Sequence, residues 1–269
     1  MWFGVIFAIS FALALPAFAD SVDRLDQLEP APEGVDPREV ALRAENSLRS
    51  DRTYMAAAMT IRSPRLSQPR VVVFKSWDDR AEKRSFIRIE APAKDKGAAF
   101  LKLHPNLWSY VPRVERTLRI PPSMMLQPWM GSDFTNDDLV NESSTIDDYD
   151  HKMLGIDPAT GGVDGERAYV LEFIPHEDAP VVWGKIVTWI AIEHGTQLLQ
   201  EFYDEDGEKL RTIRFAEIRE VDGRHVPHHW EVTPHNKDGH STSIEISEFR
   251  FDQEFDENIF TTRNLKQRN

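Results

Sequence analysis

The chain has 269 residues, with 32 Lys plus Arg against 45 Asp plus Glu, so its formal net charge is −13. A surface that follows nucleic-acid phosphates needs clustered cations, so this balance argues against a nucleic-acid partner. Hydrophobic residues make up 41% and charged residues 29%, which is typical of a globular protein and excludes wholesale disorder. The absence of cysteine excludes disulfides, thiol catalysis, thiolate metal sites and a lipid-modified N-terminal cysteine.

The first 19 residues form an apolar stretch that ends in Ala17-Phe18-Ala19. Small residues at this spacing fit the cleavage site of a signal peptide, so we predict cleavage after Ala19 and export to the periplasm. No Lys or Arg precedes the stretch, which is atypical. The alternative is a membrane anchor, which is less favoured because the stretch is near the lower limit for spanning a bilayer.

The folded domain is predicted to begin after an acidic, proline-containing segment. Residues 20–35 have little apolar periodicity and are predicted to be a flexible leader. Asp36 can cap a helix with Pro37 at its first position. Apolar residues then recur at helical spacing until about Ser50: Val40, Ala41, Ala44 and Leu48. We expect one amphipathic helix at the start of a single domain that covers residues 36–269.

Most of the remaining chain follows a period of two and is rich in β-branched and aromatic residues. Strands are predicted at 53–63, 70–77, 84–90, 98–104, 107–112, 116–120, 149–156, 166–175, 184–193, 197–204, 209–219, 225–233 and 241–251. Short turn signals, four of them Asp-Gly, separate the later strands. No βαβ alternation or Gly-rich phosphate loop is present. The predicted fold class is therefore mainly β, with a single antiparallel sheet curved into an incomplete β-barrel.

One segment between the two runs of strands does not alternate. Residues 120–141 concentrate three methionines, Trp129 and Phe134 in a short stretch. Ser123 can cap a short helix, and Asn136 or Thr135 can cap another. We predict short helices that cover the open concave side as a lid. Ser132, Asp133 and Asn136 are candidates for hydrogen bonds that break when such a lid opens. Because methionine adapts to varied apolar shapes, the segment suits acyl chains; the alternative is that it simply fills a core.

Histidines and carboxylates gather in several places without a recognisable catalytic pattern. Five histidines lie close together in the sequence: His225, His228, His229, His235 and His240. In an extended strand they point to different faces, so we expect solvated or rim histidines and no metal site. The acidic clusters are explained by turns and helix caps, and no Gly-x-Ser-x-Gly elbow is present. We expect no enzyme, although sequence alone leaves open a glycosidase whose carboxylates come from separate strands.

Several motifs resemble a known family of lipoprotein carriers. The segments 88–92 (RIEAP), 100–112 (FLKLHPNLWSYVP) and 115–117 (ERT) resemble the strand signature of the LolA/LolB-like superfamily. The segments 119–140 (RIPPSMMLQPWMGSDFTNDDLV) and 260–265 (FTTRNL) resemble its outer membrane lipoprotein-sorting protein branch. The resemblance implies a curved sheet with an N-terminal helix and lid helices over an apolar cavity. In the classical carriers a strand arginine bonds to the lid, and Arg80, Arg84 and Arg88 all lie in the matching region of this sequence.

The resemblance implies a periplasmic carrier that binds lipid or lipoprotein acyl chains and moves them towards the outer membrane. It needs no cofactor, and its expected partners are those chains and an inner-membrane exporter; we expect a monomer. The alternative is a non-transporting sensor or scaffold of the cell envelope with the same fold. The candidate lipid-binding residues of the cavity and lid are Leu101, Leu103, Trp108, Tyr110, Met124, Met125, Leu126, Trp129, Met130, Phe134 and Leu139.

Overall fold

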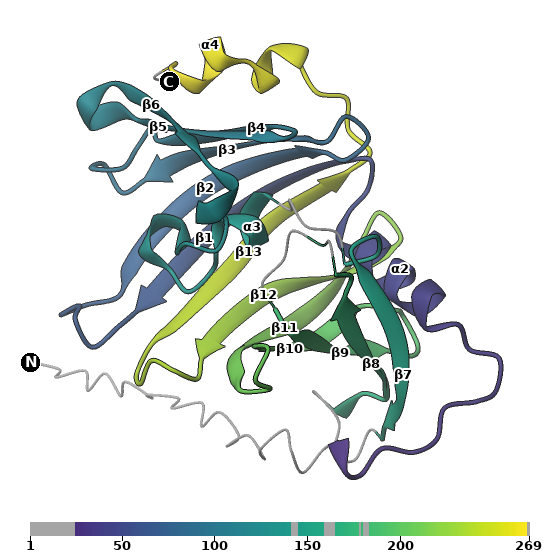
Figure 1. Ribbon diagram of the computed structural model, residues 1–269. Coiled ribbons are helices and arrows are strands. Elements are labelled where there is room, and N and C mark those ends of the chain that lie inside the picture. The colour runs from purple at the N-terminus through teal and green to yellow at the C-terminus, as the bar shows by residue number, and fades with distance from the viewer. Residues whose placement is uncertain (1–24, 141–144, 159–164, 178, 180–182, 268–269) are drawn as a thin grey trace, which may run out of the picture.

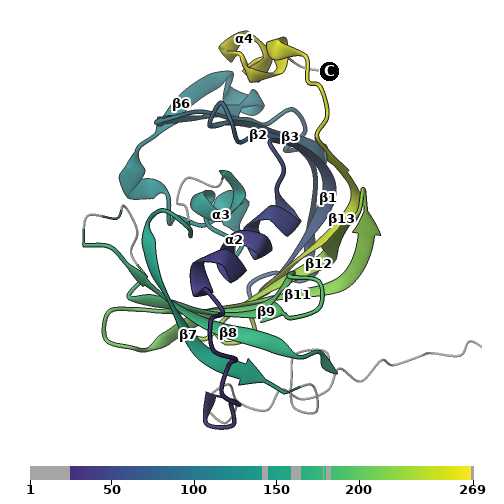
Figure 2. The same ribbon diagram turned by 90° about the vertical axis from the view of Figure 1, so that its right-hand side faces the viewer.

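The computed structural model describes residues 25–140, 145–158, 165–177, 179 and 183–267. Thirteen strands form one antiparallel sheet: β1 (Arg52–Arg62), β2 (Arg70–Asp79), β3 (Arg84–Ala91), β4 (Ala99–Leu103), β5 (Asn106–Val111), β6 (Arg116–Ile120), β7 (Tyr149–Asp157), β8 (Ala168–Pro175), β9 (Lys185–Ala191), β10 (Gln197–Tyr203), β11 (Lys209–Val221), β12 (Arg224–Pro234) and β13 (Ser241–Phe251). This confirms the predicted fold class, because the sheet is strongly curved but not closed (Figures 1 and 2).

The sheet consists of two meanders, which are joined by the first and the last strand of the chain. Strands β1 to β6 pair in sequence order, as do β7 to β13, and the two meanders meet where β1 pairs with β13. The junction is long, since it runs from Thr53 opposite Phe251 to Arg62 opposite Ser241. Consequently β6 and β7, which are consecutive in the chain, lie at opposite edges of the sheet.

The connection between β6 and β7 therefore has to pass from one edge of the curved sheet to the other. It contains the short 3-10 helices η2 (Pro122–Met124) and η3 (Trp129–Gly131) and the helix α3 (Asn136–Val140). Thr135 caps α3, because the Asp138 backbone N–H donates to its hydroxyl (3.1 Å) and its own N–H donates to the Asp138 carboxylate (2.7 Å). Figure 2 shows α3 inside the curve of the sheet. We call residues 121–140 the lid.

The predicted N-terminal helix is α2 (Pro37–Leu48), and Asp36 caps it by accepting the Arg38 backbone N–H at 2.9 Å. Its buried alanines, Ala41 and Ala44, pack into the same core as the lid. Figure 2 shows α2 lying across one end of the trough that the sheet forms. Among the described residues, no helix combines the length and apolarity needed to cross a membrane. The predicted signal peptide, residues 1–19, lies outside the described residues.

The sheet buries apolar side chains on both faces. The main core fills the concave side and includes strand residues of both meanders together with Trp129, Phe134 and Leu139 of the lid. On the outer face of β8 to β10, a second cluster around Trp189 is covered by Leu25 and Leu28. Here Glu29 and Ile156 exchange two backbone hydrogen bonds of 2.8 Å. From Leu25 onward, the segment predicted as a flexible leader thus contacts the sheet.

A third cluster lies on the outer face of β3 to β5, under the C-terminal segment. That segment contains η5 (Glu257–Phe260) and α4 (Thr262–Leu265), and Phe260 and Leu265 are buried against Phe86 and Leu101. Arg88 holds the last turn by donating to the carbonyl oxygens of Asn264 and Gln267.

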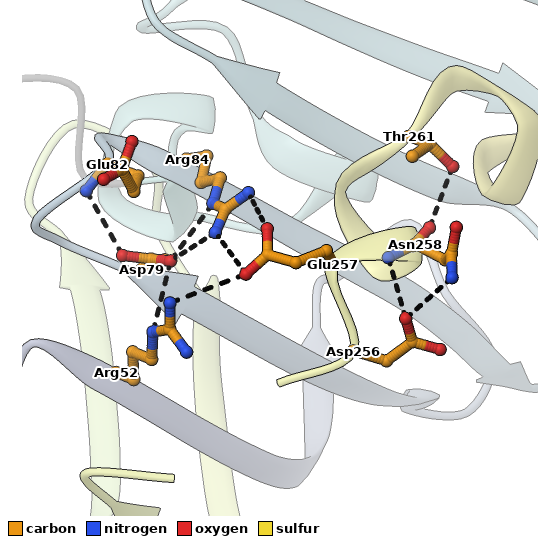
Figure 3. A network of polar contacts seen from close by, with 8 residues as sticks. All are labelled: Arg52, Asp79, Glu82, Arg84, Asp256, Glu257, Asn258 and Thr261. Atoms are coloured by element: carbon orange, nitrogen blue, oxygen red, sulfur yellow. Dashed lines mark hydrogen bonds and ion pairs between the residues drawn. The ribbon is translucent and has the colours of Figure 1, made fainter. Parts of the chain in front are cut away.

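A network of charges fastens the start of this segment to the sheet (Figure 3). Arg84 donates to the fully buried carboxylate of Asp79 (2.7 Å) and to Glu257 (2.6 Å). Arg52 approaches the same two carboxylates, at 3.4 and 3.5 Å. The guanidinium of Arg84 also lies 4.4 Å from the centre of the Phe260 ring. The C-terminal segment is therefore held by apolar packing and by a charge network at its first turn.

We expect Leu265→Ala to lower the free energy of unfolding by about 2–5 kcal/mol, because it leaves a cavity under α4. Arg263→Ala, two positions earlier on an exposed side of the same helix, should change it by less than about 0.5 kcal/mol. Urea unfolding of both variants measures the difference. Equal effects would mean that the C-terminal segment contributes no packing energy.

Candidate functional site

A cavity of about 220 Å³ lies on the concave side, between the end of α2, the lid, strands β1 and β2, and the second meander. Its wall is mainly apolar. The apolar lining residues are Leu48, Met55, Phe134, Leu139, Tyr149, Trp183, Ile186, Phe202, Ile213, Phe215, Trp230 and Phe249. Half of them come from β9 to β13, where side chains at alternate strand positions point inward.

Charged groups line the end of the cavity near α2. Arg49 donates two hydrogen bonds to Asp78, at 2.8 and 3.1 Å, and approaches Glu45 at 3.7 Å. Arg80 reaches the same Glu45 carboxylate at 3.0 Å from outside the lining. The second oxygen of Glu45 is buried and has no hydrogen-bond partner. The site therefore combines a mainly apolar wall with a group of charged side chains near α2.

The strongest contact between the lid and the sheet joins Asp138 of α3 to Arg211 of β11. Arg211 donates to both carboxylate oxygens, at 2.6 and 2.8 Å, in a bidentate pair. Its guanidinium also lies 4.2 Å from the ring centre of Phe202 and 4.6 Å from that of Trp183. Two aromatic cavity walls and the lid thus meet at one arginine. We call this ion pair the latch.

Electrostatics at the latch keep Asp138 ionised. Burial alone would raise the pKa of Asp138, but the charge and hydrogen bonds of Arg211, together with the hydrogen bonds of Thr135, outweigh it and lower the pKa below its usual value. Nearby, burial raises the pKa of Tyr149, and the charges of Asp137 and Asp148 add to this effect. The Tyr149 phenol therefore stays protonated in the cavity wall at neutral pH.

Further polar contacts hold the lid, and they include contacts of the Asp133 carboxylate with Lys237 (3.7 Å) and His240 (3.9 Å). Arg70 donates to the Met130 carbonyl at 2.8 Å, and Lys102 donates to the Val140 carbonyl at 3.1 Å. Asp133 exchanges two hydrogen bonds with Thr242, at 2.8 and 3.0 Å.

The other candidate groups named from the sequence do not join the lid to the sheet. Ser132 and Asn136 bond within the lid, to Trp129 and Met124. The arginines expected near the lid have other partners: Arg80 bonds to α2, and Arg84 and Arg88 bond to the C-terminal segment. Arg70 and Arg211 reach the lid instead.

The predicted lid residues differ in how they are placed. Trp129 is fully buried, with Phe74 and Phe100 at ring distances of 5.4 Å each, and it anchors the lid. Phe134 and Leu139 line the cavity. Met125 and Met130 are half-buried against the core and Leu126 is half-buried, whereas Met124 is exposed.

The four predicted strand residues are on the other face of the sheet. Leu101, Leu103, Trp108 and Tyr110 belong to the outer cluster beneath the C-terminal segment and do not line the cavity. Their neighbours Phe100 and Lys102 point to the lid instead. Side chains alternate between the two faces of a strand. The prediction assigned the outward-facing residues of β4 and β5 to the cavity, so all four lie away from it.

Sequence reasoning did not single out the aromatic wall contributed by the second meander, or Arg211. A signal was present, because Arg211 precedes Ile213 and Phe215 at alternate positions, so it shares their face. A charged residue on an apolar strand face requires a buried partner, and Asp138 is that partner.

The histidines are spread over several environments. His228 is buried and His225 stacks on His194, with ring centres 5.1 Å apart. Within the described ranges one group could hold a metal ion: Glu217, His229 and Glu245 place ligand atoms within 4.8 Å of one another. These residues lie on three adjacent strands and do not line the cavity.

Comparisons with known proteins identify the architecture. A family model described as "Uncharacterized protein" matches residues 81–267, more than half of the chain. Among curated proteins, none matches. Three solved structures are similar over 86% of this chain. A protein domain from Vibrio parahaemolyticus named for outer membrane lipoprotein sorting is 25% identical, with 98% of its chain covered and a TM-score of 0.74.

The other two similar structures support the same fold. A DUF1329 family protein from Desulfovibrio piger is 23% identical, with 100% of its chain covered and a TM-score of 0.75. A LolA superfamily protein from Nitrosomonas europaea is 21% identical, with 99% covered and a TM-score of 0.70.

We expect Arg211→Met to lower the free energy of unfolding by about 3–5 kcal/mol, because it leaves the Asp138 carboxylate buried without a counter-charge. The double variant Arg211→Met/Asp138→Leu removes both charges and should recover most of this loss. Urea unfolding of the four proteins of this cycle measures the coupling. A coupling below about 1 kcal/mol would place the pair among exposed salt bridges and contradict its role as a latch.

The latch should also respond to pH in a defined direction. Because the folded pKa of Asp138 is lower than the unfolded one, its contribution is complete above about pH 4 and is lost as the pH falls through the folded pKa. The stability difference between the parent and Asp138→Asn should therefore be constant from neutral pH down to about pH 5 and shrink in stronger acid. Glu205→Gln, in the exposed β10–β11 turn, controls for the change in net charge.

Proposed function

Because the chain belongs to the LolA-like superfamily, we propose that it is a carrier that binds an acyl chain of a lipid or lipoprotein in the cavity beneath the lid. The observation that supports this most directly is an apolar cavity beneath a separate cover, which is held by apolar packing around Trp129 and by polar contacts to the sheet. Phe134, Leu139 and the aromatic wall from Trp183, Phe202 and Trp230 would contact the chain.

The energetics favour a carrier with a movable cover. Burying an acyl chain stabilises the bound state by about 0.8 kcal/mol per methylene, so a lipid does not leave a membrane for water without such shelter. The cavity of about 220 Å³ is larger than one of about 150 Å³ that takes a benzene ring, but smaller than the usual ligand pocket of about 300–1,000 Å³. With the lid in place it accommodates part of one chain. A complete cargo therefore requires the lid to move outward.

Opening the lid would break both polar and apolar contacts. Its hydrogen bonds to Arg70, Lys102 and Thr242 would be exchanged for bonds to water, at about 0.5–1.5 kcal/mol each. Leu139 and Val140, buried at the end that carries Asp138, would also lose their apolar packing. Trp129 is packed between two aromatic rings and is the expected fixed point. The end of the lid that carries Asp138 would then swing away from β11 while the middle of the lid, at Trp129, stays in place.

We assign the carrier to the periplasm and its direction of transfer to the outer membrane. The assignment rests on the apolar stretch 1–19, with its predicted cleavage site after Ala19, and on the lipoprotein-sorting name of the similar Vibrio domain. An inner-membrane exporter is the proposed donor. In this role the protein acts as a monomer.

We expect a monomeric brominated fatty acid to quench the tryptophan fluorescence of the protein, because bromine quenches at short range and Trp183 and Trp230 line the cavity. The double variant Trp183→Phe/Trp230→Phe should lose most of the quenching. The matched control Trp77→Phe/Trp108→Phe, which changes two tryptophans of the outer cluster, should retain it. Native mass spectrometry of the protein purified from its own envelope should show a bound acyl species.

Quenching that survives in the cavity variant and disappears in the control would place the chain on the outer face. No quenching and no bound lipid in the folded protein would contradict the carrier and favour the sensor or scaffold with the same fold.

A further inference from the structure

The hairpin formed by β5, the 3-10 helix η1 (Pro112–Val114) and β6 exposes apolar side chains at one edge of the sheet. Val114 at its tip is 57% exposed and Leu118 on β6 is 53% exposed. Val111 is also exposed, and Met124 continues the group just beyond β6. Figure 1 shows this coiled tip at the margin of the molecule, beside the β6 label. Half of the exposed large apolar side chains of the described chain lie in this one segment.

The same hairpin carries three arginines without partners. Arg113, Arg116 and Arg119 are exposed, and in the part of the chain that the structure describes none of their side chains makes a hydrogen bond or an ion pair. Other arginines of this acidic protein, such as Arg84, Arg211 and Arg224, are paired with carboxylates. With three arginines and one glutamate, Glu115, the hairpin is a local cationic site on a chain with a net charge of −13.

The strand register places these charges around the hairpin rather than on one side of it. Arg119 is opposite Trp108, which belongs to the outer cluster, so Arg119 lies on the outer face. Arg116, opposite Val111, is three positions before Arg119. Because side chains alternate along a strand, Arg116 lies on the inner face, as does Leu118. Arg113 is in the tip. Cations thus surround an apolar tip on both faces.

We propose that this hairpin docks on the surface of an anionic lipid bilayer, with Val114 and Leu118 entering the interfacial region and the three arginines contacting acidic headgroups. A protruding tip that is cationic on both faces suits a bilayer, because headgroups surround whatever enters them. A protein partner would need a continuous patch of about 800 Å² on one face. The net negative charge of the chain keeps other surfaces away from the bilayer. The docking does not require cargo in the cavity.

The test is co-sedimentation of the full chain, without added cargo, with two kinds of vesicle: phosphatidylcholine alone, and phosphatidylcholine mixed with phosphatidylglycerol. We expect binding to the anionic vesicles only, weakened by added salt. Arg113→Gln/Arg116→Gln should weaken that binding roughly 30-fold, since each arginine near a charged surface is worth about a factor of five. Val114→Ser/Leu118→Ser should weaken it as well, with the salt dependence retained.

The matched control is Arg62→Gln/Arg65→Gln, which removes two exposed positive charges from the end of β1 and the following turn. It should leave vesicle binding within about twofold of the parent, and all variants should keep the parent's thermal midpoint. Equal weakening by the control would overturn the assignment to the hairpin. Failure of the folded parent to bind anionic vesicles would overturn the bilayer as the partner and leave a protein with an acidic face as the occupant to test.

Discussion

The organisation of this protein follows from one constraint: the concave face of an open, curved sheet is apolar and has to be covered. The two consecutive edge strands, β6 and β7, lie at opposite sides of the opening, so the chain between them has to bridge it. Its apolar residues Trp129, Phe134 and Leu139 are buried as a result. The helix α2 closes one end of the same trough. The cavity is the space that these two covers leave unfilled against the second meander.

The middle of the lid, at Trp129, and its C-terminal end, at Asp138, are held by different kinds of interaction. At Trp129 the contact is apolar, and moving it into water would cost the full burial of an indole ring. At Asp138 the contact is ionic, and its net worth depends on whether water can replace it, since opening would hydrate both charges. Arg211 contacts Asp138 of the lid and the rings of Trp183 and Phe202 in the cavity wall. A movement of the lid that breaks the ion pair therefore also changes the surroundings of these two rings.

The sequence predicted the strands and the lid well because both are encoded locally. Asp-Gly turns fix where strands end, and the non-alternating segment 120–141 marks the connection between the meanders. The site was harder, because it depends on which face of each strand turns inward. Leu101 and Trp108 lie on apolar strands that are buried on both faces, so periodicity could not orient them. The latch joins residues 73 positions apart, and only the folded sheet brings them together.

The pairing of β1 with β13 has a consequence for how the protein reaches its folded state. These strands are separated by most of the chain, and the seam between them unites the two meanders. An emerging polypeptide can form each meander from local hairpins, but it cannot join them until its last strand has arrived. Until then the edge of β1 that pairs with β13 is open to wrong partners. If the chain crosses a membrane before folding, its two meanders can be joined only after the C-terminal strand has crossed.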